Sequence, residues 1–246
     1  MKELLKQFGT LILGLAIMSF GSAMGLVADL GLGPWDVLND GMAKFLQGIF
    51  DIQLANGADL ITFGRANITI GLTILVIDVL FREKIGFGTL INILLCGNVV
   101  DFCTGDMIPG FALLPDFRGL PMAESFVLRL ILCVLSLIPA AYGMYIYMSA
   151  KLGSGPRDGL MCVLKRRAVK MPVGLVRVLL EGCALTIGWL LGGTVGLGTI
   201  ILVLLSGPVM QTIFKLHSIY PHLASTTSSH QADLDGLRSS TRGQCE

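Results

Sequence analysis

Six apolar runs dominate the sequence, and each is close to the roughly 20 residues that an α-helix needs to cross a hydrocarbon core about 30 Å thick. They lie at residues 8–30, 66–81, 85–104, 126–149, 173–191 and 195–215. Because the core of a bilayer holds no water, a segment that crosses it as a helix satisfies its own backbone hydrogen bonds. The sequence therefore predicts an all-α protein that spans the membrane six times.

Composition supports this prediction and excludes several classes of function. Hydrophobic residues make up 53% of the chain and charged residues 14%, against roughly 25% charged in a soluble domain. The net charge of +1 offers no basic surface for nucleic acid. No Cys-x-x-Cys pair occurs, all three histidines follow the last apolar run, and no catalytic or nucleotide-binding motif is present. We therefore expect neither an enzyme nor a bound cofactor or metal.

The distribution of positive charge predicts the orientation of the chain. If the N-terminus is cytoplasmic, six crossings place most lysines and arginines on the cytoplasmic side, as the positive-inside rule requires. This cytoplasmic group comprises Lys2, Lys6, Arg82, Lys84, Lys151, Arg157, Lys165, Arg166, Arg167 and Lys170. The outer side keeps Lys44, Arg65, Arg118 and Arg129. We therefore expect both termini to be cytoplasmic.

Two short motifs each occur twice, at corresponding places in the two halves of the chain. Gly31-Leu32-Gly33-Pro34-Trp35-Asp36 matches Gly153-Ser154-Gly155-Pro156-Arg157-Asp158 at four of six positions. Gly86-Phe87-Gly88-Thr89 likewise matches Gly196-Leu197-Gly198-Thr199. Each half has three crossings, an odd number, so the second half would lie upside down relative to the first. Inverted repeats of this kind are a common plan among secondary transporters.

The repeat also predicts how the chain is divided. We expect a first membrane repeat over residues 1–104, an external loop over 105–124 and a second membrane repeat over 125–216. Residues 217–246 are rich in polar residues and poor in large apolar ones, and are expected to form a disordered cytoplasmic tail.

The Gly-x-Gly-Pro-x-Asp segments are the strongest candidates for ligand binding. Each opens a short amphipathic stretch; in the first, Leu38, Met42, Phe45 and Ile49 form one apolar stripe, with Asn39, Asp40 and Lys44 off it. Proline suits the first position of a helix, and aspartate in the first turn can accept free backbone N–H groups. The candidate residues are Gly31, Gly33, Pro34, Trp35, Asp36, Gly153, Gly155, Pro156, Arg157 and Asp158.

Two interpretations of these segments remain open. In the first, the aspartates only cap two amphipathic helices that lie in the membrane interface. In the second, the helices are re-entrant and bring their N-termini to the middle of the membrane, where they can bind an anionic or zwitterionic solute.

Polar residues inside the spans are further candidates. Arg177 and Glu181 stand four residues apart and can pair on one helix face, and Glu181 is the best candidate for a proton- or cation-coupling group. Asn67 and Asn92 either line a pathway or hold helices together. Asp78 is expected to reach Arg82 at the cytoplasmic surface, and Asp101 is expected to be solvated near the outer surface.

The first motif, together with Gly-x-Gly-Thr-Leu-x-Asn at Gly86 to Asn92, resembles the YczE/YitT-type integral membrane proteins of bacteria. The resemblance covers about residues 8–216 and implies a multi-pass protein of the bacterial inner membrane. It implies no substrate. The second copy of the motif departs from the pattern because Arg157 replaces the tryptophan of the first.

Together these observations predict a transporter or channel for a small anionic or zwitterionic solute. The alternative is a non-transporting accessory or scaffold protein that supports a biosynthetic or membrane partner. A transporter requires a polar cavity between the repeats, whereas a scaffold should have a tightly packed centre. The lipid bilayer is the one partner that the sequence predicts, and self-association is left open.

The orientation is testable by cysteine labelling in intact cells. In a variant whose native cysteines are replaced by serine, single cysteines at Lys2, Glu83 and Gly236 should react with a membrane-impermeant reagent only after permeabilisation, because all three positions are expected to be cytoplasmic. Labelling of the Glu83 position in intact cells would contradict the predicted orientation.

Overall fold

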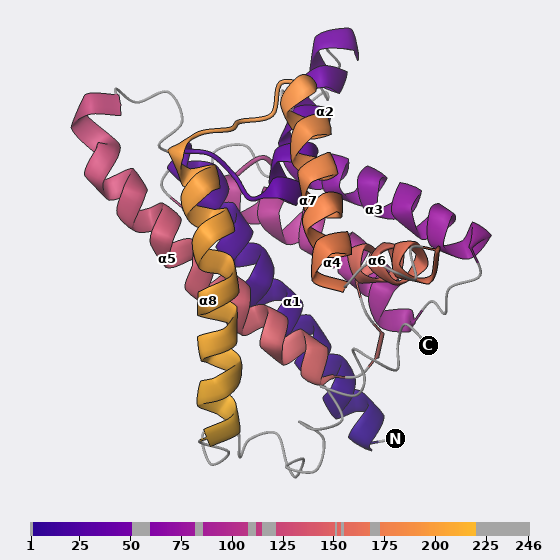
Figure 1. The fold of residues 1–246 in the computed structure, drawn as a ribbon. Coiled ribbons are helices and arrows are strands. Elements are labelled where there is room, and N and C mark those ends of the chain that lie inside the picture. Colours follow the sequence, from indigo (N-terminus) through magenta and orange to yellow (C-terminus); the bar gives the residue numbers. More distant parts are fainter. Residues whose placement is uncertain are drawn as a thin grey trace.

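The computed structural model describes residues 2–50, 60–81, 86–107, 112–114, 122–150, 152–153, 155–167 and 173–219. Within these residues the secondary structure is helical throughout, as predicted, and no strand is present (Figure 1). The helices are α1 (Lys2–Ala28), α2 (Pro34–Phe50), α3 (Phe63–Leu80), α4 (Phe87–Thr104), α5 (Met122–Ser149), α6 (Pro156–Arg167), α7 (Val173–Leu190) and α8 (Leu197–Ile219).

Five of these helices are long and apolar enough to cross a membrane. Their apolar segments are Leu4–Ala28, Phe63–Leu80, Phe87–Thr104, Ser125–Ser149 and Leu197–Leu216, and they coincide with five of the six predicted spans. The remaining predicted span, 173–191, coincides with α7, which is a helix but is not one of the five. Six crossings therefore stay a prediction. Large apolar side chains on these helices face outward, as lipid surroundings require; Leu204 on α8, for example, is 67% exposed.

The last helix is longer than expected. α8 continues to Ile219, so the start of the predicted tail at His217 is wrong by a few residues. Nothing between His217 and Ile219 opposes a helix, whereas Pro221 does, since helices usually end before the residue that precedes proline. The rest of the predicted tail lies outside the described residues.

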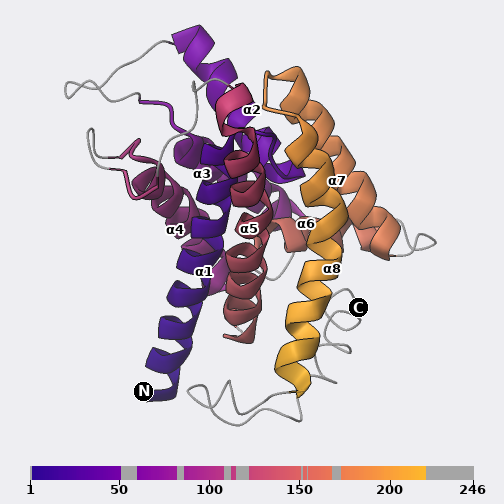
Figure 2. The ribbon, with the colours of Figure 1, turned by 90° about the vertical axis from the view of Figure 1, so that its left-hand side faces the viewer.

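The two longest helices, α1 and α5, run side by side in opposite directions at the centre of the molecule (Figures 1 and 2). Glycines allow their backbones to touch. A Cβ atom on Gly21 would lie 2.6 Å from the backbone nitrogen of Ala140, and one on Gly143 would meet the backbone of Met18. Gly31 and Gly153 are the matching first residues of the two motif copies, and Gly21 and Gly143 are separated by the same number of residues as this pair. The contacts made by Gly21 and Gly143 therefore occupy matching places in the two halves of the chain.

Most other helix contacts also form matching pairs. α4 packs on α1 and α8 packs on α5. The short helix α2 packs between α7 and α3, and the short helix α6 packs between α3 and α7. One pair does not match: α3 and α4 pack closely, whereas α7 and α8 make few contacts.

The helix α2 turns its polar side toward the protein. Asn39 is 1% exposed and Asp40 is 8% exposed, whereas Phe45 and Ile49 of the apolar stripe are 47% and 57% exposed. Asp40 accepts hydrogen bonds from the Thr194 backbone N–H, at 2.7 Å, and from its hydroxyl. A helix on a water-soluble protein shows the reverse arrangement.

Two carboxylates that were expected at the membrane surface are buried. Asp101 is 5% exposed and accepts hydrogen bonds from the Gly64 N–H, at 2.7 Å, and from the Thr62 hydroxyl, at 2.5 Å, where α3 begins. Asp78 is 2% exposed and lies against the first turns of α6, where a Cβ on Gly159 would be 2.5 Å from its Oδ2. The expectation that Asp101 is solvated was wrong, and the burial of Asp78 was not expected, because the start of a neighbouring helix, with its free N–H groups and positive dipole end, attracts a carboxylate. The predicted contact of Asp78 with Arg82 lies outside the described residues.

The contact between α1 and α5 gives a matched test of the packing. Gly21→Ala should destabilise the protein by about 1–3 kcal/mol, the usual result of overpacking, because the added methyl meets backbone rather than a movable side chain. Gly9→Ala, on the same helix, is the control, since no atom lies within 4 Å of its Cβ position. Thermal unfolding in detergent measures both. Equal melting temperatures for the two variants would contradict the close contact.

Candidate functional site

The segments that precede α2 and α6 share two backbone features in their described residues. Gly31 has a φ of +117° and Gly153 a φ of +130°, in the region that residues with a side chain avoid. Pro34 and Pro156 are the first residues of their helices, as the motif predicted. Both segments therefore make a sharp turn out of a long helix and into a short one.

Each of these segments is held by the Gly-x-Gly-Thr segment of the other half. The Gly198 N–H donates to the Leu30 carbonyl at 2.8 Å, and the Gly88 N–H donates to the Leu152 carbonyl at 2.9 Å. The backbones touch closely enough that a Cβ on Gly31 would lie 2.6 Å from the backbone nitrogen of Gly196. The two motifs that recur in the sequence thus bind one another across the halves of the chain.

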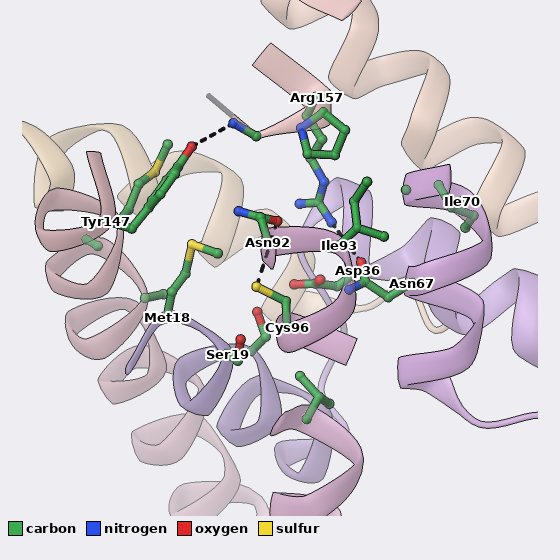
Figure 3. Close-up of a pocket in the computed structure, with 18 of the residues that line it drawn as sticks. Met18, Ser19, Asp36, Asn67, Ile70, Asn92, Ile93, Cys96, Tyr147 and Arg157 are labelled. Carbon is green, nitrogen blue, oxygen red and sulfur yellow. Dashed lines mark hydrogen bonds between the residues drawn. The ribbon is translucent and has the colours of Figure 1, made fainter. Parts of the chain in front are cut away.

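A cavity of about 270 Å³ lies beside the starts of α2 and α6 (Figure 3). Its wall comes from α1, α3, α4, α5 and α8 as well as from the two short helices. The polar groups in its wall belong to Ser19, Ser22, Asp36, Asn67, Asn92, Cys96, Tyr147, Arg157 and Ser206. The apolar part of the wall comprises Met18, Phe63, Ile70, Ile74, Ile93, Val100, Leu137, Ala140, Ala141, Met144 and Met210.

Arg157 is held in place by two contacts. Its guanidinium carbon lies 4.9 Å from the centre of the Trp35 ring, a cation–π arrangement. Its Nη2 donates a long hydrogen bond of 3.5 Å to the Oδ1 of Asn67, which also accepts from the Nδ2 of Asn39 at 3.0 Å. Trp35 and Arg157 occupy the same position in the two copies of the motif, and this is the one position at which the copies differ in charge. The structure places these two residues in contact with each other.

Asp36 lies close to Asn67, on the side of the cavity that Arg157 approaches (Figure 3). Among the residues that the structure describes, its carboxylate makes neither a hydrogen bond nor an ion pair. The backbone at the start of α2 is instead bonded to itself, with the Val37 N–H donating to the Gly33 carbonyl at 2.8 Å. The cavity therefore holds one carboxylate and one guanidinium that are not bonded to each other.

Tyr147 and Cys96 are members of the wall that the sequence did not indicate. The Gly155 N–H donates to the Tyr147 hydroxyl at 2.9 Å, so α5 fixes the start of α6. Cys96 lies one helical turn after Asn92, and its thiol is 3.8 Å from the Asn92 Oδ1. A buried tyrosine near the end of an apolar span, which needs a partner for its hydroxyl, is the signal that could have revealed Tyr147.

The predicted site residues fall into three groups. Lining the cavity are Asp36, Asn67, Asn92, Gly155, Pro156 and Arg157. Gly31, Gly33, Pro34, Trp35 and Gly153 shape or support the turns around it. Arg177 and Glu181 pair with each other at 2.9 Å on an exposed face of α7, outside the cavity wall. The side chain of Asp158 lies outside the described part of the structure.

Comparison with known proteins places the chain in a family. Residues 5–215 match a family of unknown function designated DUF6198. A protein of Haemophilus influenzae is 29% identical, over 89% of this chain and 88% of its own. The membrane protein YczE of Bacillus subtilis is 28% identical, over 85% of this chain and 86% of its own. The protein YyaS of Bacillus subtilis is 22% identical, over 83% of this chain and 90% of its own. No solved structure matches the chain. The chain therefore belongs to the DUF6198 family, and it is a multi-pass membrane protein of the YczE type that its glycine–proline motifs predict.

Proposed function

We propose that the protein carries a small charged or zwitterionic solute across the bacterial inner membrane by way of the cavity between α2 and α6. One observation carries the proposal. Asp36 and Arg157 come from the two copies of the motif, and both line one cavity without being bonded to each other. Ionised groups at such a depth are costly and usually serve a function.

The proposed architecture is a pair of inverted three-span repeats with both termini in the cytoplasm. Its support lies in matching contacts: Gly21 and Gly143 at the crossing of α1 and α5, and the two hydrogen bonds that link Leu30 to Gly198 and Leu152 to Gly88. Contacts related in this way are expected when two copies of one unit face each other about an axis in the membrane plane.

Re-entry of α2 and α6 into the membrane is also part of the proposal. An interfacial helix would place its polar side in water. The buried Asn39 and Asp40 and the exposed Phe45 and Ile49 favour a helix that has protein on its polar side and lipid on the other. Non-spanning backbone is tolerated at this depth where protein covers it or where it lines a cavity.

The difference between the matched helix pairs suggests how access to the cavity changes. α3 and α4 are packed together, whereas α7 and α8 make few contacts. In the proposed cycle, the halves exchange these arrangements, so that one pair opens as the other closes. This is the rocking of one repeat against the other that such transporters use.

Access of water to the cavity distinguishes a transporter from a scaffold. In variants that keep only one native cysteine, a small hydrophilic methanethiosulfonate should label Cys96 in the folded protein, because this thiol faces the cavity. Cys133 is the control: it is fully buried against Ala28 and Leu30 and should react only after denaturation. A Cys96 that also reacts only after denaturation would favour the packed centre of a scaffold.

The role of the Asp36 charge is testable with a panel of metabolites, before the substrate itself is identified. Asp36→Asn should not lower the melting temperature of the free protein, because this carboxylate makes no hydrogen bond in the described structure and asparagine has nearly the same shape. The variant should lose the increase in melting temperature that a bound metabolite gives to the wild type. Asp106→Asn, which removes a carboxylate outside the cavity wall, is the control and should keep that increase. A metabolite that stabilises Asp36→Asn as much as the wild type would contradict the role of Asp36.

A further inference from the structure

We infer that the solute is an amino acid with an aliphatic side chain, bound as a zwitterion with its carboxylate at Arg157 and its ammonium group at Asp36. This inference rests on the proposed function and specifies the class of substrate. It is carried by three properties of the cavity: its balance of charge, the arrangement of that charge, and the apolar character of the remaining wall.

The balance of charge favours a molecule with both signs. The described wall contains one carboxylate, Asp36, and one guanidinium, Arg157. A simple anion at the guanidinium would also lie near the Asp36 carboxylate, which repels it, and a simple cation at Asp36 would be repelled by Arg157. Burial of an unpaired charge is costly, so a zwitterion is the solute that leaves neither protein group unpaired.

The geometry leaves both groups available to a ligand. Trp35 covers one face of the Arg157 guanidinium, and a cation–π contact leaves the N–H groups at the edge of the guanidinium free to donate. Asn67 takes one of them through a long bond of 3.5 Å, which a carboxylate can replace with shorter, charge-assisted bonds. Asp36 lies beside Asn67 in the same part of the cavity (Figure 3), so the two charges of a small molecule can be met together.

The rest of the wall suits an aliphatic group. Ile70, Ile74 and Ile93 project from α3 and α4, and Leu137 and Met144 face the same cavity from α5. These apolar side chains offer contact area but no hydrogen-bonding group. The volume of about 270 Å³ lies just below the roughly 300–1,000 Å³ of pockets for drug-sized molecules, which fits a solute of amino-acid size.

The test compares each amino acid with analogues that lack one charge. Calorimetry on the purified full-length protein should show that one or more aliphatic L-amino acids, from alanine to leucine and methionine, bind. For leucine the analogues are 4-methylpentanoate, which lacks the ammonium group, and 3-methylbutylamine, which lacks the carboxylate. Each analogue should bind at least about tenfold more weakly, because each loses a charge-assisted hydrogen bond. L-glutamate and L-lysine, which carry an additional charge, should not compete.

The variants should reproduce the pattern of the analogues. Asp36→Asn should lower the affinity for leucine to about that of 4-methylpentanoate and leave the affinity for this analogue unchanged. Arg157→Gln should lower the affinity for leucine to about that of 3-methylbutylamine and leave the affinity for that analogue unchanged. Arg65→Gln removes an exposed guanidinium outside the cavity wall and should change neither affinity. In this pattern, removal of a charge from the ligand and removal of its partner from the protein have the same effect. A general loss of folding cannot produce it, because it would weaken every ligand alike.

Two results would overturn the inference. One is equal binding of an amino acid and an analogue that lacks a charge. The other is the absence of binding by every aliphatic amino acid to a protein whose Cys96 is accessible to the hydrophilic reagent. Accessibility of Cys96 is measured independently, so the second result rejects this substrate class and leaves the proposed function standing. An inaccessible Cys96 rejects the proposed function itself.

Discussion

Two backbone hydrogen bonds hold the centre of this protein together, from Gly198 to the Leu30 carbonyl and from Gly88 to the Leu152 carbonyl. Each joins the turn in one half of the chain to the start of a helix in the other half. Only glycine allows the approach, because a Cβ at Gly31 or Gly196 would meet the opposite backbone. The positions of α2 and α6, and therefore of Asp36 and Arg157, depend on these contacts.

The membrane explains features that would be errors in a soluble protein. In water, the apolar stripe of α2 would be buried and its polar side exposed; here Asn39 and Asp40 are buried and Phe45 and Ile49 are exposed. In lipid, polar groups must find partners inside the protein. Asp40 accordingly bonds to Thr194, and Asp101 to Thr62 and Gly64. Contacts of this kind specify how helices are arranged when hydrophobic burial cannot, since lipid is as apolar as the helix surfaces.

Local patterns in the sequence predicted the helices and much of the site. Hydrophobic length located the apolar helices, and the repeated motif located the two turns and their prolines. The same motif and the polar residues of the spans identified Asp36, Asn67, Asn92 and Arg157, which the structure brings to one cavity. What could not be predicted depends on contacts between distant segments. Three features of this kind have no local pattern in the sequence. They are the burial of Asp78 against α6, the hydrogen bond between Tyr147 and Gly155, and the position of the Arg177–Glu181 pair outside the cavity wall.

The contact between Trp35 and Arg157 shows what a chain that carries both copies of a motif can do that a symmetric dimer cannot. In a dimer of identical subunits, a residue that meets its own counterpart on the symmetry axis meets an identical side chain. Two arginines at that position would repel each other, and two tryptophans would bring no charge. Joined in one chain, the two positions can mutate separately, and a tryptophan in one copy can support an arginine in the other. In the proposed inverted repeat, the joining of the halves thus permits a charged group on the axis that relates them, where exact symmetry would forbid an attractive pair of unlike residues.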